Sequence, residues 1–464
     1  MPRLYAVKVR LYPTPAQEMA FRQIAGCCRL VFNLALEQRR DFWRAHHRAV
    51  GKHISWMGQK REVTALKADP DLEWLKAVPA HCLQMALFDV DNAFQRFFKK
   101  LGGYPKFRKR GDGDRFTFPD RKQIVVEEGK DGLLVLPKFG KTKNDNGPIR
   151  ARIHRPLQGQ VRSVTMSCRG GRWFASILLR KRVAVVDPSK VDPSKVAPSV
   201  VRVEDVVGAD RGTAVPVATS EGVLMGVPVD RERQARKASR RKLRQKRLQQ
   251  KLARQKKGSK NREKTKRCLA RHHAREADRR QDLRHKMTHA LACGHTVVVF
   301  EDLKITNMTA AAKGTLEEPG CNIAQKAGLN RVILEAGWGE IGRQLTYKTA
   351  LRGGQVVKVS AHHSSQTCAA CGHVDAKSRV SRDRFACTRC SHQAHADINA
   401  AMVIRQRGLV VLGLAKKAAK ESARKPQGNP SVGTVEEACG ALCERQGCEP
   451  GKTSLWTDHA PLAV

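Results

Sequence analysis

The sequence predicts an α+β protein of several domains, in which a small N-terminal β-barrel with an inserted helical region precedes an α/β domain. Three observations predict this arrangement. Short runs with period-two alternation flank a segment with helical periodicity. Farther along the chain, apolar strand patterns alternate with helical ones, as in a sheet covered by helices. The length of 464 residues allows two or three domains, each with its own core.

The N-terminal barrel is expected in two pieces, residues 1–12 and 103–184, and the inserted helical region covers 13–102. That region begins with Thr14 and Pro15, which suit the N-cap and the first turn of a helix. An apolar stripe on one helix face is expected in the core and consists of Leu83, Leu87, Val90, Phe94 and Phe97.

A tandem Val-Asp-Pro-Ser-Lys repeat marks residues 185–200 as a linker, because it is rich in proline and has no hydrophobic period. The α/β domain follows over 201–363, then a cysteine block over 364–393 and a last helix over 394–410. The tail, 411–464, is rich in glycine, proline and lysine and is expected to be disordered.

The chain is strongly basic: 88 Lys and Arg against 43 Asp and Glu give a net charge of +45. Residues 230–289 hold 25 Lys and Arg and 6 Asp and Glu, a net charge of +19, and their sparse leucines predict two helices forming a hairpin. A solvated face would suit a balanced run, but these charges repel one another unless a polyanion lies alongside, which predicts a nucleic-acid contact. Candidate phosphate ligands there are Arg240, Arg241 and Arg244.

A second candidate nucleic-acid contact mixes aromatic and basic residues. Tyr104 and Phe107 have rings that can stack on bases, and Lys106 and Arg108 have charges that can bind phosphates. The alternative is a barrel edge with core aromatics, and the sequence leaves both interpretations open.

Four cysteines have the spacing of a structural zinc site. Cys368 and Cys371 form one Cys-x-x-Cys turn, and Cys387 and Cys390 form a second after fifteen intervening residues. Each turn points two thiolates into one cleft, so the two turns complete a tetrahedral shell for Zn²⁺. Four protein ligands leave no open position for water, which predicts a site that holds structure.

Three acids lie at the ends of predicted elements. Asp210 and Glu301 end two strands, and Asp397 opens the last helix. Carboxylates from two strand ends and a helix start can converge around Mg²⁺, and a pair of such ions supports phosphodiester cleavage. Asp302 is an alternative to Glu301, but neighbouring side chains on a strand point to opposite faces, so only one of the two reaches the site.

These motifs resemble the TnpB family of transposon-encoded RNA-guided DNA endonucleases with a RuvC-like nuclease domain. The matching stretches span about residues 5 to 405 and include "GADRGTAVPVATSEG", "VVFEDLKITNM", "AGWGEIGRQLTYKTALRGGQVVKVSA", "SSQTCAACG" and "RFACTRCSHQAHADINAA". One departure is Arg211, which follows the first acid where many members carry an apolar residue.

The resemblance implies an RNase H-like (RuvC) fold in which Asp210, Glu301 and Asp397 are the catalytic acids that bind Mg²⁺. It implies a zinc ribbon inserted before the last catalytic helix, a wedge formed by the barrel, and a recognition region formed by the inserted helices. The implied partners are a guide RNA from the transposon end and a double-stranded DNA target, cut next to a short motif.

Three alternatives have other functions: a compact type V CRISPR effector, a transposase, and a non-cleaving RNA-guided DNA-binding regulator. The sequence has no signal-peptide pattern at its start, and no apolar run approaches the ~18 residues of a membrane span. We therefore expect no membrane partner and a cytoplasmic, nucleoid-associated location in a prokaryote.

Overall fold

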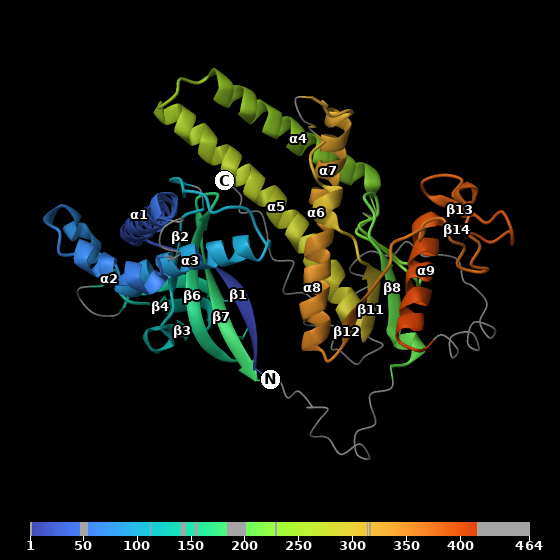
Figure 1. The fold of residues 1–464 in the computed structure, drawn as a ribbon, viewed down its shortest axis with the longest axis horizontal. Coiled ribbons are helices and arrows are strands. Elements are labelled where there is room, and N and C mark those ends of the chain that lie inside the picture. Colours follow the sequence, from blue (N-terminus) through green and yellow to red (C-terminus); the bar gives the residue numbers. More distant parts are fainter. Residues whose placement is uncertain are drawn as a thin grey trace, which may run out of the picture. The chain divides into compact units, whose positions relative to one another are not determined.

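A computed structural model describes most of the chain (Figure 1). The described residues are 2–46, 54–111, 113–140, 145–153, 156–182, 201–227, 230–312, 314 and 317–414. The chain divides into two units: one comprises 1–185 with 251–274, and the other comprises 186–250 with 275–464. The predicted linker, 185–200, and all but the first four residues of the predicted tail lie outside the described residues.

The first unit is built on a seven-stranded antiparallel sheet with the order β2-β6-β7-β1-β5-β4-β3. Its strands are β1 (Pro2–Tyr12), β2 (Arg115–Phe118), β3 (Val125–Glu127), β4 (Gly129–Val135), β5 (Ile149–Ile153), β6 (Gln160–Arg169) and β7 (Arg172–Arg182). The β6–β7 hairpin turns at Gly170 and Gly171, whose φ values of 58° and 72° are ones that glycine adopts without strain.

Helices between β1 and β2 share one core with this sheet. They are α1 (Pro15–His46), α2 (Trp56–Leu66), the 3₁₀ helix η1 (Pro70–Ala77) and α3 (Ala80–Phe98). The ring of Phe21 on α1 is fully buried, and its centroid lies 5.0 Å from those of Phe139 and Trp173. By length and composition α1 could cross a membrane, but a buried core helix passes the same test.

The predicted apolar stripe on α3 enters the core only in part. Leu83, Leu87 and Val90 are buried, and Phe94 packs partly buried against the same core. Phe97, however, is 36% exposed, so the expectation that it is a core residue is wrong. The helix runs past the edge of the core it packs on, and periodicity alone does not mark where that core ends.

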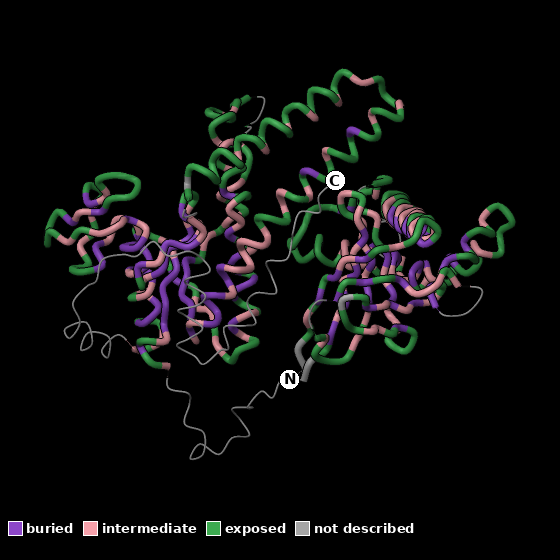
Figure 2. The backbone as a smooth tube through the Cα atoms, turned by 180° about the vertical axis from the view of Figure 1, so that it is seen from behind, coloured by how far each residue is buried: buried purple, intermediate pink, exposed green. Residues whose placement is uncertain are grey.

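The second unit contains a five-stranded mixed sheet with the order β10-β9-β8-β11-β12. The strands are β8 (Val206–Asp210), β9 (Val217–Thr219), β10 (Leu224–Met225), β11 (Val297–Glu301) and β12 (Gln355–Val359). β8, β11 and β12 are parallel, and β9 and β10 continue the sheet in antiparallel fashion. Every residue of β11 is buried, and Figure 2 shows these central strands as buried.

Helices pack on both faces of this sheet. They are α8 (Trp338–Leu351) and α9 (Ala396–Val411); the short α6 (Ile305–Met308) and α7 (Ile323–Ala336) stand between β11 and α8 in the chain. On one face, Phe300 of β11 packs in a cluster with Ile341 of α8, and on the other Val299 packs with Ile404 of α9. Alternation along β11 therefore assigns the odd-numbered residues, Glu301 among them, to the face covered by α9.

Two long helices, α4 (Arg231–Arg254) and α5 (Lys260–Gly294), form the hairpin expected from the basic run (Figure 1). They pass through both units, since residues 251–274 belong to the first. Their turn is fixed by Arg262, whose guanidinium donates to the carbonyl of Gln255 at 2.8 Å. Most of the hairpin is exposed (Figure 2), as expected for its charge.

Candidate active site and metal centre

Asp210 and Glu301 lie side by side at the carboxyl ends of two parallel strands. The β8–β11 register pairs Ala209 with Phe300, so the next residues, Asp210 and Glu301, are neighbours across the sheet. Both fall on the face that α9 covers, because they share the parity of Gly208 and Val299, which contact that helix. The two acids, 91 residues apart in sequence, thus reach the same edge of one sheet.

Helix α9 crosses this sheet at close range and carries Asp397 in its first turn. A Cβ added to Gly208 would lie only 2.0 Å from the carbonyl oxygen of Ala401, so only glycine allows the approach. Arg405 fixes the crossing by donating to the carbonyl oxygens of Val206 and Val203, at 2.8 and 2.7 Å. The start of the helix is thereby held beside the end of β8.

The electrostatics link Asp210 to the other two acids. Burial and the negative charges of Glu301 and Asp397 raise the pKa of Asp210 to about 7. Burial also raises the pKa of Asp397, although Arg379 opposes this from 3.6 Å away. Like charges held together in a buried site favour protonation or the binding of a cation.

Glu301, and not Asp302, faces the other two acids. Glu301 is 7% exposed, and its carboxylate accepts a hydrogen bond from the buried hydroxyl of Ser364. Asp302 is exposed and pairs with Lys358, the carboxylate oxygen 3.0 Å from the ammonium nitrogen. The two neighbouring residues therefore point in different directions, and Glu301 is the one on the face that α9 covers.

Arg211 is a structural residue next to the acids. The residue is 6% exposed, and its guanidinium lies 4.5 Å from the centre of the Phe300 ring and donates to the carbonyl oxygens of Glu301 and Trp338. Burial lowers the pKa of Arg211. Arg211, which stands where many members of the family carry an apolar residue, thus ties the end of β11 to the start of α8.

The four predicted cysteines converge. Their sulfur atoms all lie within 4.8 Å of one another, and among the described residues no other group of three or more His, Cys, Asp or Glu is as tight. The Cys368–Cys390 and Cys371–Cys387 sulfur distances are 3.6 and 3.7 Å. A tetrahedral ZnS₄ shell with Zn–S bonds of ~2.3 Å requires about 3.8 Å, whereas a disulfide requires ~2.05 Å.

Backbone geometry shapes each cysteine turn for a metal. The N–H of Cys368 donates to His373 and that of Cys387 to His392, both at 2.8 Å. The N–H of Arg389 donates to the sulfur of Cys387 at 3.4 Å. Backbone N–H donors, first that of Cys390, lower the pKa of Cys387 to about 6, whereas burial raises the pKa of Cys368. Without a metal, Cys387 is therefore the thiol of this pair that ionises more readily.

The first cysteine turn is attached to the helix that carries Asp397. Asn399, fully buried on α9, donates to the carbonyl of Thr367 at 2.8 Å and accepts from the N–H of Ala369 at 2.9 Å. Two turns farther along the helix, the side chain of Gln406 donates to the carbonyl of Ala369 at 2.6 Å. The cysteine block therefore forms part of the support of the acidic site.

Three family models match parts of the chain: a helix-turn-helix domain over residues 1–48, a model described as "Probable transposase" over 189–312, and a Cas12f1-like TNB domain over 338–404. Within the first match, the described residues form one strand, β1, and one helix, α1. The third spans the four cysteines and Asp397.

The chain is 37% identical over 415 residues to InsQ of Escherichia coli (strain K12), a protein provisionally named as an RNA-guided DNA endonuclease. The match covers 89% of this chain and 94% of InsQ. The chain belongs to the TnpB family. A protein of Streptomyces pristinaespiralis with the same provisional name is 30% identical over 90% of this chain and 92% of its own length.

A solved Cas12f1–sgRNA–target DNA complex is similar to this TnpB-family chain at 14% identity and a TM-score of 0.48. The match covers 87% of this chain and 99% of the Cas12f1 chain.

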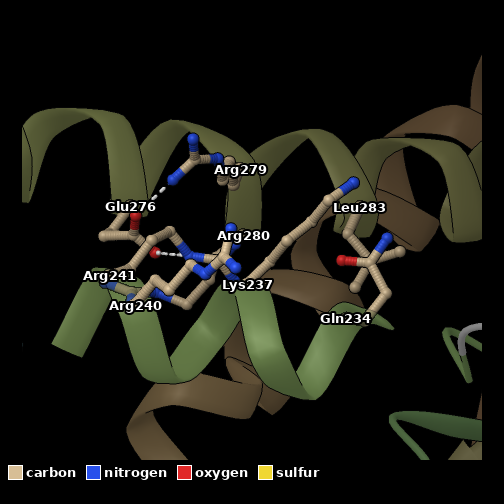
Figure 3. A pocket seen from close by; sticks show the side chains of 8 residues that line it. All are labelled: Gln234, Lys237, Arg240, Arg241, Glu276, Arg279, Arg280 and Leu283. Atoms are coloured by element: carbon tan, nitrogen blue, oxygen red, sulfur yellow. Dashed lines mark hydrogen bonds and ion pairs between the residues drawn. The ribbon is translucent and has the colours of Figure 1, made fainter. Parts of the chain in front are cut away.

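A basic cavity lies between α4 and α5 of the TnpB-family chain, within the second unit (Figure 3). Its volume is about 700 Å³. Its cationic lining residues are Lys237, Arg240, Arg241, Arg279 and Arg280. Glu276 is 3.3 Å from Arg241 and also pairs with Arg279, so two of the five cations are partly neutralised. Arg244 is exposed on α4 outside this lining.

The aromatic-basic segment has mixed surroundings. Tyr104 and Lys106 are exposed, and Phe107 is 41% exposed beneath the guanidinium of Arg40, 5.2 Å from its ring centre. Arg108 pairs with Asp89 at 2.8 Å and lies over the ring of a core phenylalanine, so part of its charge is used within the fold.

Sequence reasoning missed three residues of the TnpB-family site: Ser364, Arg379 and Asn399. Each contacts an acid or its helix only because of the tertiary fold, and none stands in a pattern of known chemical meaning. Only Asn399 gave a weak sequence signal, since it is a polar residue two positions after Asp397 among apolar residues of the same helix.

Proposed function

We propose that this chain is an insertion-sequence-encoded, RNA-guided DNA endonuclease that cuts double-stranded DNA by metal-dependent phosphodiester hydrolysis. The observation that carries the proposal is the adjacency of Asp210 and Glu301 across two parallel strands, with Asp397 close enough to raise the pKa of Asp210. The names of the relatives that the chain matches over most of its length support the same activity.

The residues that would hold Mg²⁺ are Asp210, Glu301 and Asp397. Carboxylate oxygens are the ligands that Mg²⁺ prefers. Burial and, after it, repulsion from Glu301 and Asp397 raise the pKa of Asp210, and a bound cation would relieve that repulsion. When bound, the ions would activate water and stabilise the leaving oxygen.

Arg379 and Ser364 would assist without binding metal. Arg379, within the cysteine block, lies 3.6 Å from Asp397 and offers positive charge where a phosphate would arrive. The hydroxyl of Ser364 donates to Glu301 and so fixes the orientation of that carboxylate. Both groups reach the site from segments that the zinc would anchor.

We assign the second unit to the RuvC-like (RNase H-like) nuclease and the first to the wedge and recognition regions. Support for the nuclease assignment is the mixed sheet, in which β8 is parallel to β11 and antiparallel to β9. Support for the other is the antiparallel sheet with helices inserted between β1 and β2. Zn²⁺ held by the four cysteines would be structural.

The proposed partners are a guide RNA transcribed from the transposon end and a double-stranded target recognised beside a short motif. Pairing with the guide would read sequence, while the protein contacts the backbone and shape of the heteroduplex. The basic cavity between α4 and α5 supports a contact of the protein with the nucleic-acid backbone, because clustered cations on an exposed hairpin can bind phosphates.

The proposal is tested by purifying the chain with co-expressed RNA from the transposon flank. The bound RNA is sequenced, and a plasmid library with randomised flanks is then incubated with the complex and Mg²⁺. We expect double-strand cuts beside one enriched motif. A bound RNA without cleavage would identify a non-cleaving regulator, and a dependence on a CRISPR repeat RNA would identify a type V effector.

A further inference from the structure

Four aromatic rings gather at the carboxyl-terminal end of α3, where the helix leaves the core of the first unit. The Phe97 ring centre lies 5.3 Å from that of Tyr104 and 5.5 Å from that of Phe98. Phe94 lies 5.7 Å from Tyr104, edge to face, and 6.2 Å from Phe98 with nearly parallel planes. The rings therefore form one continuous cluster, called here the α3 ring cluster.

The α3 ring cluster is open to solvent. Phe98 is 73% exposed and Tyr104 is 46% exposed, and the neighbouring Leu101 is 66% exposed. Leu87 and Val90, earlier on the same helix, are buried. Exposed apolar side chains that adjoin one another mark binding surfaces in soluble proteins more often than single exposed residues do.

All the charged residues in the chain around the cluster are basic. Residues 96–110 contain seven Lys and Arg and no Asp or Glu. Lys99, Lys100 and Lys106 are exposed, whereas Arg108 in the same stretch pairs with Asp89. Exposed rings surrounded by cations favour a polyanion that also offers flat aromatic faces over an apolar protein surface.

The end of α3 adds an independent observation. The N–H of Leu101 donates to Arg96 at 2.8 Å and the N–H of Lys100 donates to Phe97 at 2.9 Å, which is the helix ending that usually places glycine at the position of Lys100. Lys100 has φ of 56°, in the left-handed region. Lys100 therefore has a backbone conformation that is unfavourable for a lysine, and it follows Phe98 by two residues and Phe97 by three.

We propose that the α3 ring cluster stacks unpaired nucleobases of a single strand, with Lys99, Lys100 and Lys106 binding the adjoining phosphates. The inference rests on the proposed function, since an enzyme that opens a duplex exposes unpaired bases. The proposal adds Phe97 and Phe98 to the nucleic-acid contact predicted from the sequence at Tyr104, whose ring lies beside that of Phe97. Stacking tolerates any base, so the site would hold a strand without reading its sequence.

The first test localises the contact. The full-length Asp210→Asn chain, loaded with its RNA, is photo-crosslinked to single-stranded DNA containing 4-thiothymidine or to single-stranded RNA containing 4-thiouridine, and the cross-linked peptides are mapped. We expect cross-links within residues 94–104, and the DNA and RNA arms show which strand occupies the site. The proposal would be overturned if no cross-link mapped to residues 94–104 with either the DNA or the RNA.

The second test separates stacking from charge. Phe98→Ala is expected to weaken binding of a single-stranded oligonucleotide about tenfold, and Phe98→Trp to preserve it. An oligonucleotide with abasic sites at the cross-linking positions should bind the parent and Phe98→Ala alike. Trp74→Ala is the matched control, because Trp74 is a 43% exposed aromatic elsewhere in the same unit.

Lys100→Gly distinguishes binding from folding. Glycine suits the left-handed backbone, so the melting temperature should stay equal or rise, while the salt dependence of oligonucleotide binding falls by about 0.7 in log–log slope. Equal affinity of Phe98→Ala for intact oligonucleotides would overturn the proposal. So would a loss confined to self-association in size-exclusion chromatography, which would indicate a protein interface. Guided plasmid cleavage by the parent chain tests the proposed function separately.

Discussion

The side-chain amide of Asn399 donates a hydrogen bond to the carbonyl oxygen of Thr367, 2.8 Å away. Thr367 immediately precedes the first zinc-ligand candidate, and Asn399 follows Asp397 by two residues on α9. The cysteine knuckle and the acid are thus joined through one buried amide. A metal held by the four cysteines would therefore anchor the helix that presents Asp397.

Replacing Asn399 with alanine should uncouple the knuckle from the acid. The change removes two hydrogen bonds and leaves buried backbone groups without partners, which should lower the free energy of unfolding by about 1–3 kcal/mol. Cleavage should fall by more than about tenfold, since a small misplacement of Asp397 is costly. Thermal melts and single-turnover cleavage measure the two effects, and Val410→Ala, exposed on the same helix, is the control.

Zinc removal should resemble that variant. Chelation followed by metal analysis should show loss of zinc, a lower melting temperature and loss of cleavage together. Full cleavage by zinc-free protein, or by Asn399→Ala at a temperature where it is folded, would contradict the coupling.

Gly208→Ala should disrupt the crossing of α9 over the sheet. The new Cβ would meet the carbonyl oxygen of Ala401 at 2.0 Å, and backbone cannot rotate away as a side chain does. We expect a loss of stability of about 1–3 kcal/mol or more and a loss of cleavage. Gly328→Ala on α7 is the control, because a Cβ there meets nothing within 4 Å. Equal melting temperatures for the two variants would refute the close packing of α9 on β8.

The raised pKa of Asp210 predicts a pH dependence of stability. Its value of about 7 exceeds the ordinary 3.8, so the metal-free folded chain binds more protons than the unfolded chain between about pH 4 and 7. The free energy of unfolding should therefore fall as pH rises through this window, by an amount on the order of 2–4 kcal/mol. Asp210→Asn should flatten the dependence.

Added Mg²⁺ should act in the opposite direction, because it binds the ionised carboxylate. The rise in melting temperature caused by Mg²⁺ should grow from about pH 5.5 to about pH 8 and should be absent in Asp210→Asn. A Mg²⁺ effect independent of pH in this range would argue against metal binding at Asp210.

The cavity between α4 and α5 should contribute to the salt dependence of nucleic-acid binding. Lys237→Gln, Arg240→Gln and Arg280→Gln should each reduce the log–log slope for duplex DNA or RNA by about 0.9. Lys76→Gln, whose lysine pairs with Glu73 at 3.1 Å in the other unit, should leave it unchanged. Binding titrations between about 50 and 200 mM salt measure these slopes. Unchanged slopes for all three cavity variants would exclude the cavity as a phosphate-binding site.

Much of this site could be predicted because its parts obey local rules. Buried apolar runs that end in Asp210 and Glu301 indicate strands with acids at their ends, and the cysteine spacing determines a metal site without knowledge of the fold. Strand alternation predicted that only one of Glu301 and Asp302 reaches the site, and the family resemblance indicated Glu301.

The remainder depends on packing between distant segments. The register of β8 against β11 and the crossing of α9 at Gly208 decide which acids meet, and nothing local records either. Phe97 illustrates the same limit: helical spacing predicts it on the core face of α3, but the residue is 36% exposed. The partners of Asn399 likewise arise from tertiary contacts alone.

Guided cleavage by the amide variants Asp210→Asn, Glu301→Gln and Asp397→Asn, beside Asp302→Asn, tests most directly whether the three acids act together on one phosphodiester. Each of the first three should lower the single-turnover rate by about 100-fold or more without loss of guide RNA or melting temperature, while Asp302→Asn cuts as the parent does. Cleavage at the parental rate by all three would contradict the account.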